Sequence, residues 1–98
     1  MNRDHRYFVY LLASEPYGTL YAGVTGNLPG RIAEHRDNLR DGFTKKYGVH
    51  LLVWFEAFAD VHEAILREKR IKKWNRAWKI ELIEKENPLW NDLFMRIV

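Results

Sequence analysis

Two short runs of aromatic and branched side chains, separated by a turn, constrain the fold of this chain most. Residues 6–12 form the first run and residues 19–23 form the second. Residues 14–18 between them contain Pro16 and Gly18, which favour a turn. Because dense apolar runs of this length are typical of buried strands, the sequence predicts a β-hairpin at the start of one hydrophobic core.

A helix and a third strand are predicted to follow the hairpin. Asn27 is a candidate N-cap, and its helix is expected to end near Leu39, before a loop at residues 43–48. Residues 50–58 contain mostly branched and aromatic side chains, which favour a strand. If the first strand is central, the helix connects the two outer strands across the sheet.

Two more helices are predicted in the second half of the chain. Asp60 and Glu63 have the spacing of a capping box, so they predict a helix that continues to about Lys73. Asn75 is a candidate N-cap for a last helix that ends near Glu86. The predicted order is β-β-α-β-α-α, an α+β fold in which helices flank a three-stranded antiparallel sheet.

The length and composition fit one compact domain. The chain has 98 residues, of which 47% are hydrophobic and 30% charged, a balance typical of a folded domain. This length is too short for two domains. We therefore expect a single domain over residues 1–98, with the apolar tail at residues 89–98 packed back on its body.

Cysteine usage and hydrophobic patterning limit the chemistry and the location. The sequence contains no cysteine, which excludes disulfides, thiol catalysis and zinc held by cysteine. No signal-peptide core precedes the first strand, and no apolar stretch approaches the roughly 20 residues of a membrane span. The sequence therefore predicts a cytoplasmic protein without a membrane partner.

A strip of basic residues lies in the second half of the chain, whose formal net charge is +3. Such a strip can face nucleic-acid phosphates, with Trp74 or Trp78 stacked on a base. It can equally be the solvated face of helices whose tryptophans are buried, and the sequence favours neither interpretation. The strip consists of Arg67, Lys69, Arg70, Lys72, Lys73, Arg76 and Lys79.

Two tyrosines in the predicted hairpin form the first candidate site. If Leu12 pairs with Thr19, then Tyr10 stands opposite Tyr21 on the same face of the sheet. A one-residue slip of the register would separate the two phenols. Phenols on one face are more often core or interface residues than functional groups, so the pattern alone favours packing.

Arg31 and His35 form the second candidate site, because a spacing of four residues places both on one helix face. They can be an exposed, solvated pair. They can also be a phosphate clamp, in which the arginine offers a planar fork of donors and the histidine a second donor or a proton carrier. The spacing does not decide between these alternatives.

Glu68 is the third candidate, at the border of the face that its helix is predicted to bury. Lys72, Asn75 and Lys79 lie near it if the helix continues unbroken. The commoner outcome is a salt bridge to a neighbouring lysine. The alternative is a carboxylate that holds one hard cation, since Mg²⁺ takes few protein ligands and keeps several waters.

Five segments occur together and in the order found in a known nuclease family. Phe8-Val9-Tyr10 and Tyr21-Ala22-Gly23 form a pair of triplets. The other segments are residues 21–35, 43–47, 63–74 and 87–90. Nearly the whole chain thus resembles the GIY-YIG nuclease superfamily, in particular its small stand-alone branch, which is related to the incision subunit of excision repair.

The resemblance implies a role for each candidate residue. Tyr10 and Tyr21 would flank the scissile phosphate, and one of them would be the general base for the attacking water. Arg31 would stabilise the charge on the phosphorus centre, with His35 beside it. Glu68 would bind a single Mg²⁺ or Mn²⁺ that contacts the leaving oxygen. A lone carboxylate fits a one-metal mechanism of hydrolysis.

One departure from the family pattern concerns the charge beside the tyrosines. Val24 follows the second triplet, where the excision-repair nucleases carry a lysine. A phenol needs a nearby cation to act as a base at neutral pH, so Lys45, Lys46 or Lys79 would have to supply it. Together with Lys72, these lysines are predicted to bind nucleic acid.

The resemblance therefore implies a metal-dependent endonuclease, with DNA favoured over RNA as the substrate and DNA repair as the setting. The alternative is a nucleic-acid-binding module that keeps the fold but is catalytically weak or silent. A protein-interaction adaptor is a more distant alternative. The small surface also leaves open a homodimer or a partner protein as a way to widen the contact with the substrate.

Overall fold

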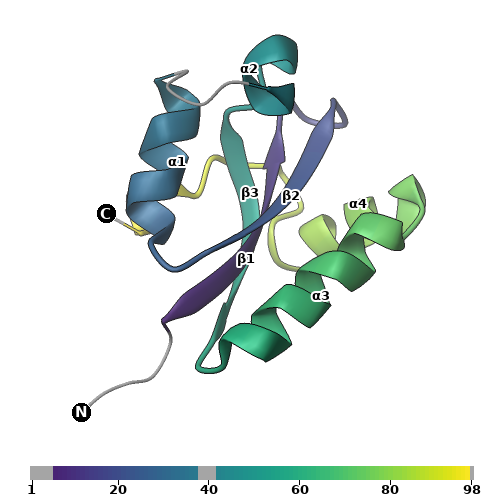
Figure 1. Ribbon diagram of the computed structural model, residues 1–98. Coiled ribbons are helices and arrows are strands. Elements are labelled where there is room, and N and C mark those ends of the chain that lie inside the picture. Colours follow the sequence, from purple (N-terminus) through teal and green to yellow (C-terminus); the bar gives the residue numbers. More distant parts are fainter. Residues whose placement is uncertain (1–5, 38–41, 98) are drawn as a thin grey trace.

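A three-stranded antiparallel sheet forms the centre of the molecule (Figure 1). The computed structural model describes residues 6–37 and 42–97. The strands are β1 (Tyr7–Ala13), β2 (Leu20–Thr25) and β3 (Leu51–Phe58), in the order β2-β1-β3. The first strand is central, and both of its neighbours run antiparallel to it.

Helices cover both faces of the sheet, and Figure 1 shows α1 and α3 on opposite sides of it. The helices are α1 (Leu28–Arg36), α2 (Phe43–Tyr47), α3 (Val61–Lys73) and α4 (Arg76–Glu86), followed by the short 3₁₀-helix η1 (Phe94–Arg96). These helices and the antiparallel sheet confirm the predicted α+β class. Among the described residues, no helix is long and apolar enough to cross a membrane.

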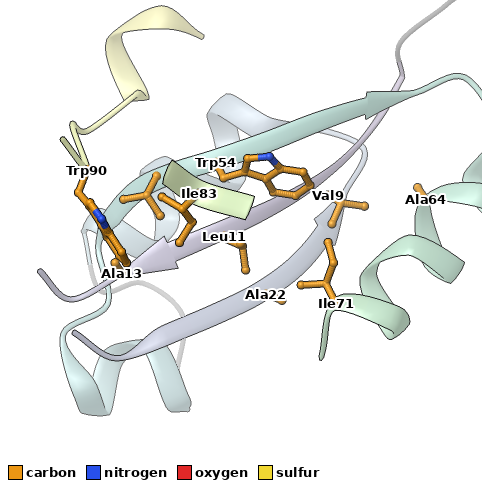
Figure 2. Close-up of a cluster of buried hydrophobic side chains, with 10 residues drawn as sticks. Val9, Leu11, Ala13, Ala22, Trp54, Ala64, Ile71, Ile83 and Trp90 are labelled. Atoms are coloured by element: carbon orange, nitrogen blue, oxygen red, sulfur yellow. The ribbon is translucent and has the colours of Figure 1, made fainter. Parts of the chain in front are cut away.

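The side chains of β1 alternate between two separate hydrophobic clusters. Val9 and Leu11 belong to the cluster that also contains Ile71 of α3 and Ile83 of α4 (Figure 2). Tyr10 and its neighbours on the other face belong to a second cluster, which includes residues of α1. The second cluster consists of Tyr10, Leu12, Leu28, Ile32, Val49, Leu52 and Leu93. The central strand is thus buried on both sides, which accounts for its unbroken run of apolar residues.

The three predicted helix N-caps are confirmed by their hydrogen bonds. The side chain of Asn27 accepts from the amide of Gly30 at 3.2 Å. The side chains of Asp60 and Asn75 accept from amides at the starts of α3 and α4, each at 2.9 Å. Each bond satisfies a backbone N–H that has no partner inside the helix.

The loop predicted at residues 43–48 is wrong, because most of it forms the helix α2. Gly42 (φ 107°) and Gly48 (φ 63°) border this single turn with backbone conformations that favour glycine. Gly48 ends the helix in a left-handed cap. The predicted end of the preceding helix, near Leu39, lies outside the described residues, which place α1 up to Arg36.

The C-terminal tail packs back on the sheet, as predicted. The amide of Leu93 donates to the carbonyl of Leu52 at 2.8 Å. The side chain of Asn87 donates to the carbonyls of Val53 (3.0 Å) and Asn91 (2.9 Å). These bonds fasten the segment after α4 to the edge strand β3.

Glu84 on α4 connects the hairpin turn to the C-terminal tail. Its Oε2 accepts a hydrogen bond from Nε1 of Trp90 at 2.8 Å and another from the hydroxyl of Tyr17. The Tyr17 and Trp90 rings also lie against each other, with centroids 4.9 Å apart. The hydrogen bonds from Trp90 and then from Tyr17 lower the pKa of the Glu84 carboxyl.

A pH dependence of stability follows from this lowered pKa. The charged carboxylate is favoured by folding, so its contribution is complete above the ordinary pKa of a glutamate and is lost as the pH falls through the lower pKa of the folded state. We expect Glu84→Gln to reduce the free energy of unfolding at pH 7, measured by urea denaturation, and the difference from wild type to shrink in acid. A difference that is the same at both pH values would contradict this, and Glu81→Gln on the same helix is the control.

Candidate functional site

The two tyrosines of the hairpin lie on one face of the sheet, although the predicted register is wrong. Leu12 pairs with Tyr21 rather than with Thr19, and Tyr10 pairs with Gly23. A shift by two residues keeps the same face, because side chains alternate along a strand. The rings of Tyr10 and Tyr21 are therefore diagonal neighbours, with centroids 6.4 Å apart.

Because Gly23 has no side chain, the phenol of Tyr10 has room to lie across the hairpin. A Cβ atom at position 23 would lie 2.4 Å from both Cζ and the hydroxyl oxygen of Tyr10. Since real side chains never approach that closely, the last residue of the triplet Tyr21-Ala22-Gly23 has to be glycine for Tyr10 to keep its place.

His35 is buried and lies beside both phenols. Its side chain is only 3% exposed, so the interpretation of Arg31 and His35 as an exposed pair is wrong for the histidine. Its Nε2 lies 3.2 Å from the hydroxyl of Tyr10, and the centroid of its ring lies 5.7 Å from that of Tyr21. The buried histidine thus connects α1 to the tyrosine pair.

Thr44 on α2 is a site residue to which the sequence gave no role. Its hydroxyl lies 2.9 Å from Nδ1 of His35, and its side chain is buried. Both ring nitrogens of His35 therefore have a partner, so the chain of hydrogen bonds runs from Thr44 through His35 to Tyr10. The sequence offered only a weak signal for this role, a small polar residue directly before two lysines. No periodic pattern marks the position.

Arg31 lies one turn before His35 on α1 and is partly exposed. Its Nε is 3.6 Å from Oε1 of Glu34, with 30% of the arginine side chain accessible. A long, half-exposed pair of this kind holds a guanidinium only weakly. A guanidinium carries five N–H donors, so this contact leaves most of its capacity for an anion.

Glu68 forms the salt bridge that was one of its two predicted alternatives. Its Oε2 lies 2.7 Å from Nζ of Lys72, and its side chain is 10% exposed. The hydrogen bond that Lys72 donates to Glu68 is the main cause of a raised pKa of Lys72. The pair lies on α3, which packs against the strand β2 that carries Tyr21.

The candidate residues form two groups on the two faces of the sheet. Tyr10 and Tyr21 lie on the face that α1 covers, whereas α3 packs against β1 and β2 from the other face. Because β2 is an edge strand, no further strand among the described residues separates the two faces on its outer side. The structure brings Tyr10, Tyr21 and His35 together, and it pairs Glu68 with Lys72 on α3.

The other predicted lysines lie in different places. Lys45 and Lys46 are exposed on α2, directly after Thr44. Lys79 belongs to α4, because the chain is extended at Trp74 and Asn75 and the two helices are separate, as predicted. The condition that would place Lys79 on the same helix as Glu68 is therefore not met. Lys79 lines a hollow of about 290 Å³ that also contains Thr19, Leu20 and Arg76.

One member of the basic strip, Arg67, is held in contacts within the protein. Arg67 pairs with Glu56 at 3.0 Å and lies over the rings of Trp54 and Trp74, which gives it a structural role. Trp78 is 55% exposed and lines a second hollow together with Trp74. Stacking of a base on this tryptophan remains a prediction.

Glu68 suits a divalent cation only as a single carboxylate ligand. Among residues 6–37 and 42–97, no group of three or more His, Cys, Asp or Glu side chains could hold a metal. Mg²⁺ accepts this arrangement, because it binds through one or two carboxylates and completes its shell with water and phosphate oxygens. Lys72 uses Oε2 of Glu68, and the carboxylate has a second oxygen to offer.

Comparison with known proteins identifies the fold and its relatives. Residues 6–81 match the family model described as the GIY-YIG catalytic domain. The UPF0213 protein of Clostridium perfringens is 38% identical over 80 residues, which cover 82% of this chain and 85% of the relative. The UPF0213 protein of Staphylococcus haemolyticus is 34% identical over 79 residues, covering 81% and 95%.

A solved structure has the same architecture. The solution NMR structure of a UPF0213 protein from Bacillus halodurans superposes with a TM-score of 0.55 and 27% identity, over 88% of this chain and 90% of that one. The resemblance to the GIY-YIG superfamily and to its small stand-alone branch is therefore confirmed.

The close approach of Tyr10 to Gly23 generates a test of the site's construction. We expect Gly23→Ala to reduce the free energy of unfolding by about 1–3 kcal/mol, the usual range for an overpacked core, because the added methyl displaces the phenol. Urea denaturation measures this loss. Gly26→Ala is the control, since the nearest atom to its Cβ is 3.8 Å away. Equal stability of the two variants would show that Tyr10 moves without cost.

Proposed function

Since this chain belongs to the GIY-YIG catalytic-domain family, we propose that it is a metal-dependent endonuclease that hydrolyses phosphodiester bonds in nucleic acid. DNA is the proposed substrate, and RNA is the alternative. The proposed mechanism uses one divalent cation and a tyrosine as the general base.

The observation that carries this proposal is the cluster of Tyr10, Tyr21 and His35 at the strand β2, against which α3 packs with its Glu68–Lys72 pair. Tyr21 comes from the sheet, whereas Glu68 and Lys72 come from α3. Core packing gives no reason for a histidine, two phenols and a nearly buried carboxylate to lie around one strand. Phosphoryl transfer does, because it needs a base, positive charge and a metal ligand within reach of one phosphorus atom.

Tyr21 is better placed than Tyr10 to take the proton. Its side chain is partly exposed, whereas Tyr10 has no accessible surface and is hydrogen-bonded to His35. In the proposed step, the phenolate form of Tyr21 takes a proton from a water as the oxygen of that water forms a bond to phosphorus. The bond between phosphorus and the leaving oxygen then breaks, and the leaving oxygen departs with the electron pair and takes a proton from solvent. Tyr10 and His35 hold the neighbouring polar groups in position.

Positive charge is needed on both sides of the reacting phosphate. A phenol is a weak base at neutral pH unless cations lie beside it. Arg31 stands one turn before His35 on α1, and its planar fork of donors suits two oxygens of a phosphate. Its proposed role is to stabilise the negative charge that grows on the phosphorus centre during attack.

Glu68 is the proposed ligand of Mg²⁺ or Mn²⁺. When bound, the ion supplies positive charge for the leaving oxygen. Lys72 already neutralises the Glu68 carboxylate, and two cations at one carboxylate repel each other. We therefore expect tight metal binding only together with a substrate phosphate, which adds negative charge to the site.

Cleavage of labelled nucleic acids tests this function. The substrates are single-stranded, duplex and branched DNA and RNA, with Mg²⁺ or Mn²⁺, and the proteins are wild type, Tyr21→Phe and Glu68→Gln. We expect the wild type to cut at least one DNA. Each variant should cut at least about a hundredfold more slowly, the usual loss when a general base or a metal ligand is removed.

The control is Glu63→Gln, which removes an exposed carboxylate from the same helix and should leave cleavage unchanged. Binding of DNA should persist in Tyr21→Phe and Glu68→Gln, as measured by fluorescence anisotropy. Binding without any cleavage by the wild type would instead establish the alternative, a silent binding module. A wild type that neither binds nor cuts would reject both.

A further inference from the structure

Lys72 stands out among the basic residues of α3 because its charged end is held at the site. Its Nζ lies 2.7 Å from Oε2 of Glu68, while 52% of the lysine side chain remains accessible. An ammonium group has three donors, of which a carboxylate oxygen takes one. The group is therefore fixed on one side and reachable by an incoming anion on the other.

Lys72 also belongs to the helix that packs against the strand carrying Tyr21. The helix α3 contacts β2, and the side chain of Tyr21 on that strand is partly exposed. The carboxylate to which Lys72 donates is the one proposed to hold the metal. A phosphate bound by a metal at Glu68 would therefore come within reach of the ammonium group.

The edge strand itself brings no cation to this position. Leu20, Ala22 and Val24 are the residues of β2 that face α3, and they pack with the cluster beneath that helix. Side chains of β2 on the other face include Tyr21 and Gly23, which carry no formal positive charge. The strand β2 itself therefore offers no cation to a phosphate beside Tyr21.

Helix stability is a weak reason for this arrangement. A salt bridge between residues four apart on a helix contributes only about 0.3–0.5 kcal/mol when it is exposed. An ordinary pair of this kind has both partners in solvent, whereas the side chain of Glu68 is 10% exposed and rigidly placed by α3. The geometry fits a positioned charge better than a surface pair.

We propose that Lys72 is a catalytic residue whose ammonium group, positioned by Glu68, contacts a non-bridging oxygen of the scissile phosphate beside Tyr21. This inference rests on the proposed nuclease function. It assigns to α3 the cation that the sequence led us to expect from Lys45, Lys46 or Lys79. The contact strengthens as negative charge grows on the phosphate, so it lowers the barrier more than it tightens binding.

The test compares Lys72→Met, Lys72→Arg and the matched control Lys69→Met, which removes the same charge from an exposed position of α3. Single-turnover cleavage of a DNA that the wild type cuts gives the rate at saturating protein, and anisotropy in EDTA gives Kd. Thermal unfolding confirms that each variant is folded.

We expect Lys72→Met to slow cleavage by about a hundredfold, the usual cost of removing one charge-stabilising donor, with little change in Kd. Lys72→Arg should recover part of the rate. Lys69→Met should weaken binding slightly and leave the rate at saturation unchanged.

Two results would overturn the inference while the nuclease function stands. One is a Lys72→Met variant that cuts as fast as the wild type. The other is an equal loss in Lys72→Met and Lys69→Met, which would mean that both lysines only attract DNA. A wild type that cuts nothing would instead reject the nuclease function, and this inference with it.

Discussion

The passage of the Tyr10 side chain across Gly23 is the contact on which the rest of the site depends. It places the phenol of the central strand beneath α1, where His35 meets its hydroxyl, and His35 in turn meets Thr44 of α2. One buried side chain thus ties together both strands of the hairpin and two helices. Because the hydroxyl of Tyr10 and both ring nitrogens of His35 have hydrogen-bond partners, this arrangement is rigid. It therefore holds the neighbouring strand, which carries Tyr21, in place.

An edge strand lets the two faces of a thin sheet contribute to one site. β2 has helices near both of its faces, and β1 is its partner on one side. Residues of α3 therefore lie against the same strand that carries Tyr21, from the opposite face. A chain of 98 residues can in this way combine a buried, hydrogen-bonded group of side chains with a charged, accessible pair on a helix.

Patterns among neighbouring residues predicted most of the fold, whereas the parts that depend on the turn geometry or on distant contacts were missed. The strands and the caps at Asn27, Asp60 and Asn75 follow from neighbouring residues, and the structure confirms them. The hairpin register was missed because its turn uses a left-handed Tyr17 (φ 62°), which no sequence rule favours. The helix α2 was missed for a related reason, since it is one short turn that a tertiary contact to His35 fixes. The catalytic roles of the site residues remain proposals that rest on the family and on this geometry.

The most direct test of this account is a crystal structure of the protein with Mn²⁺ and a DNA that a phosphorothioate at the scissile position protects from cleavage. Anomalous scattering locates the manganese independently of the protein. The account predicts a manganese peak at Glu68, with the protected phosphate between Glu68 and Tyr21. DNA bound elsewhere, for example over Trp78, or manganese away from Glu68, would contradict it.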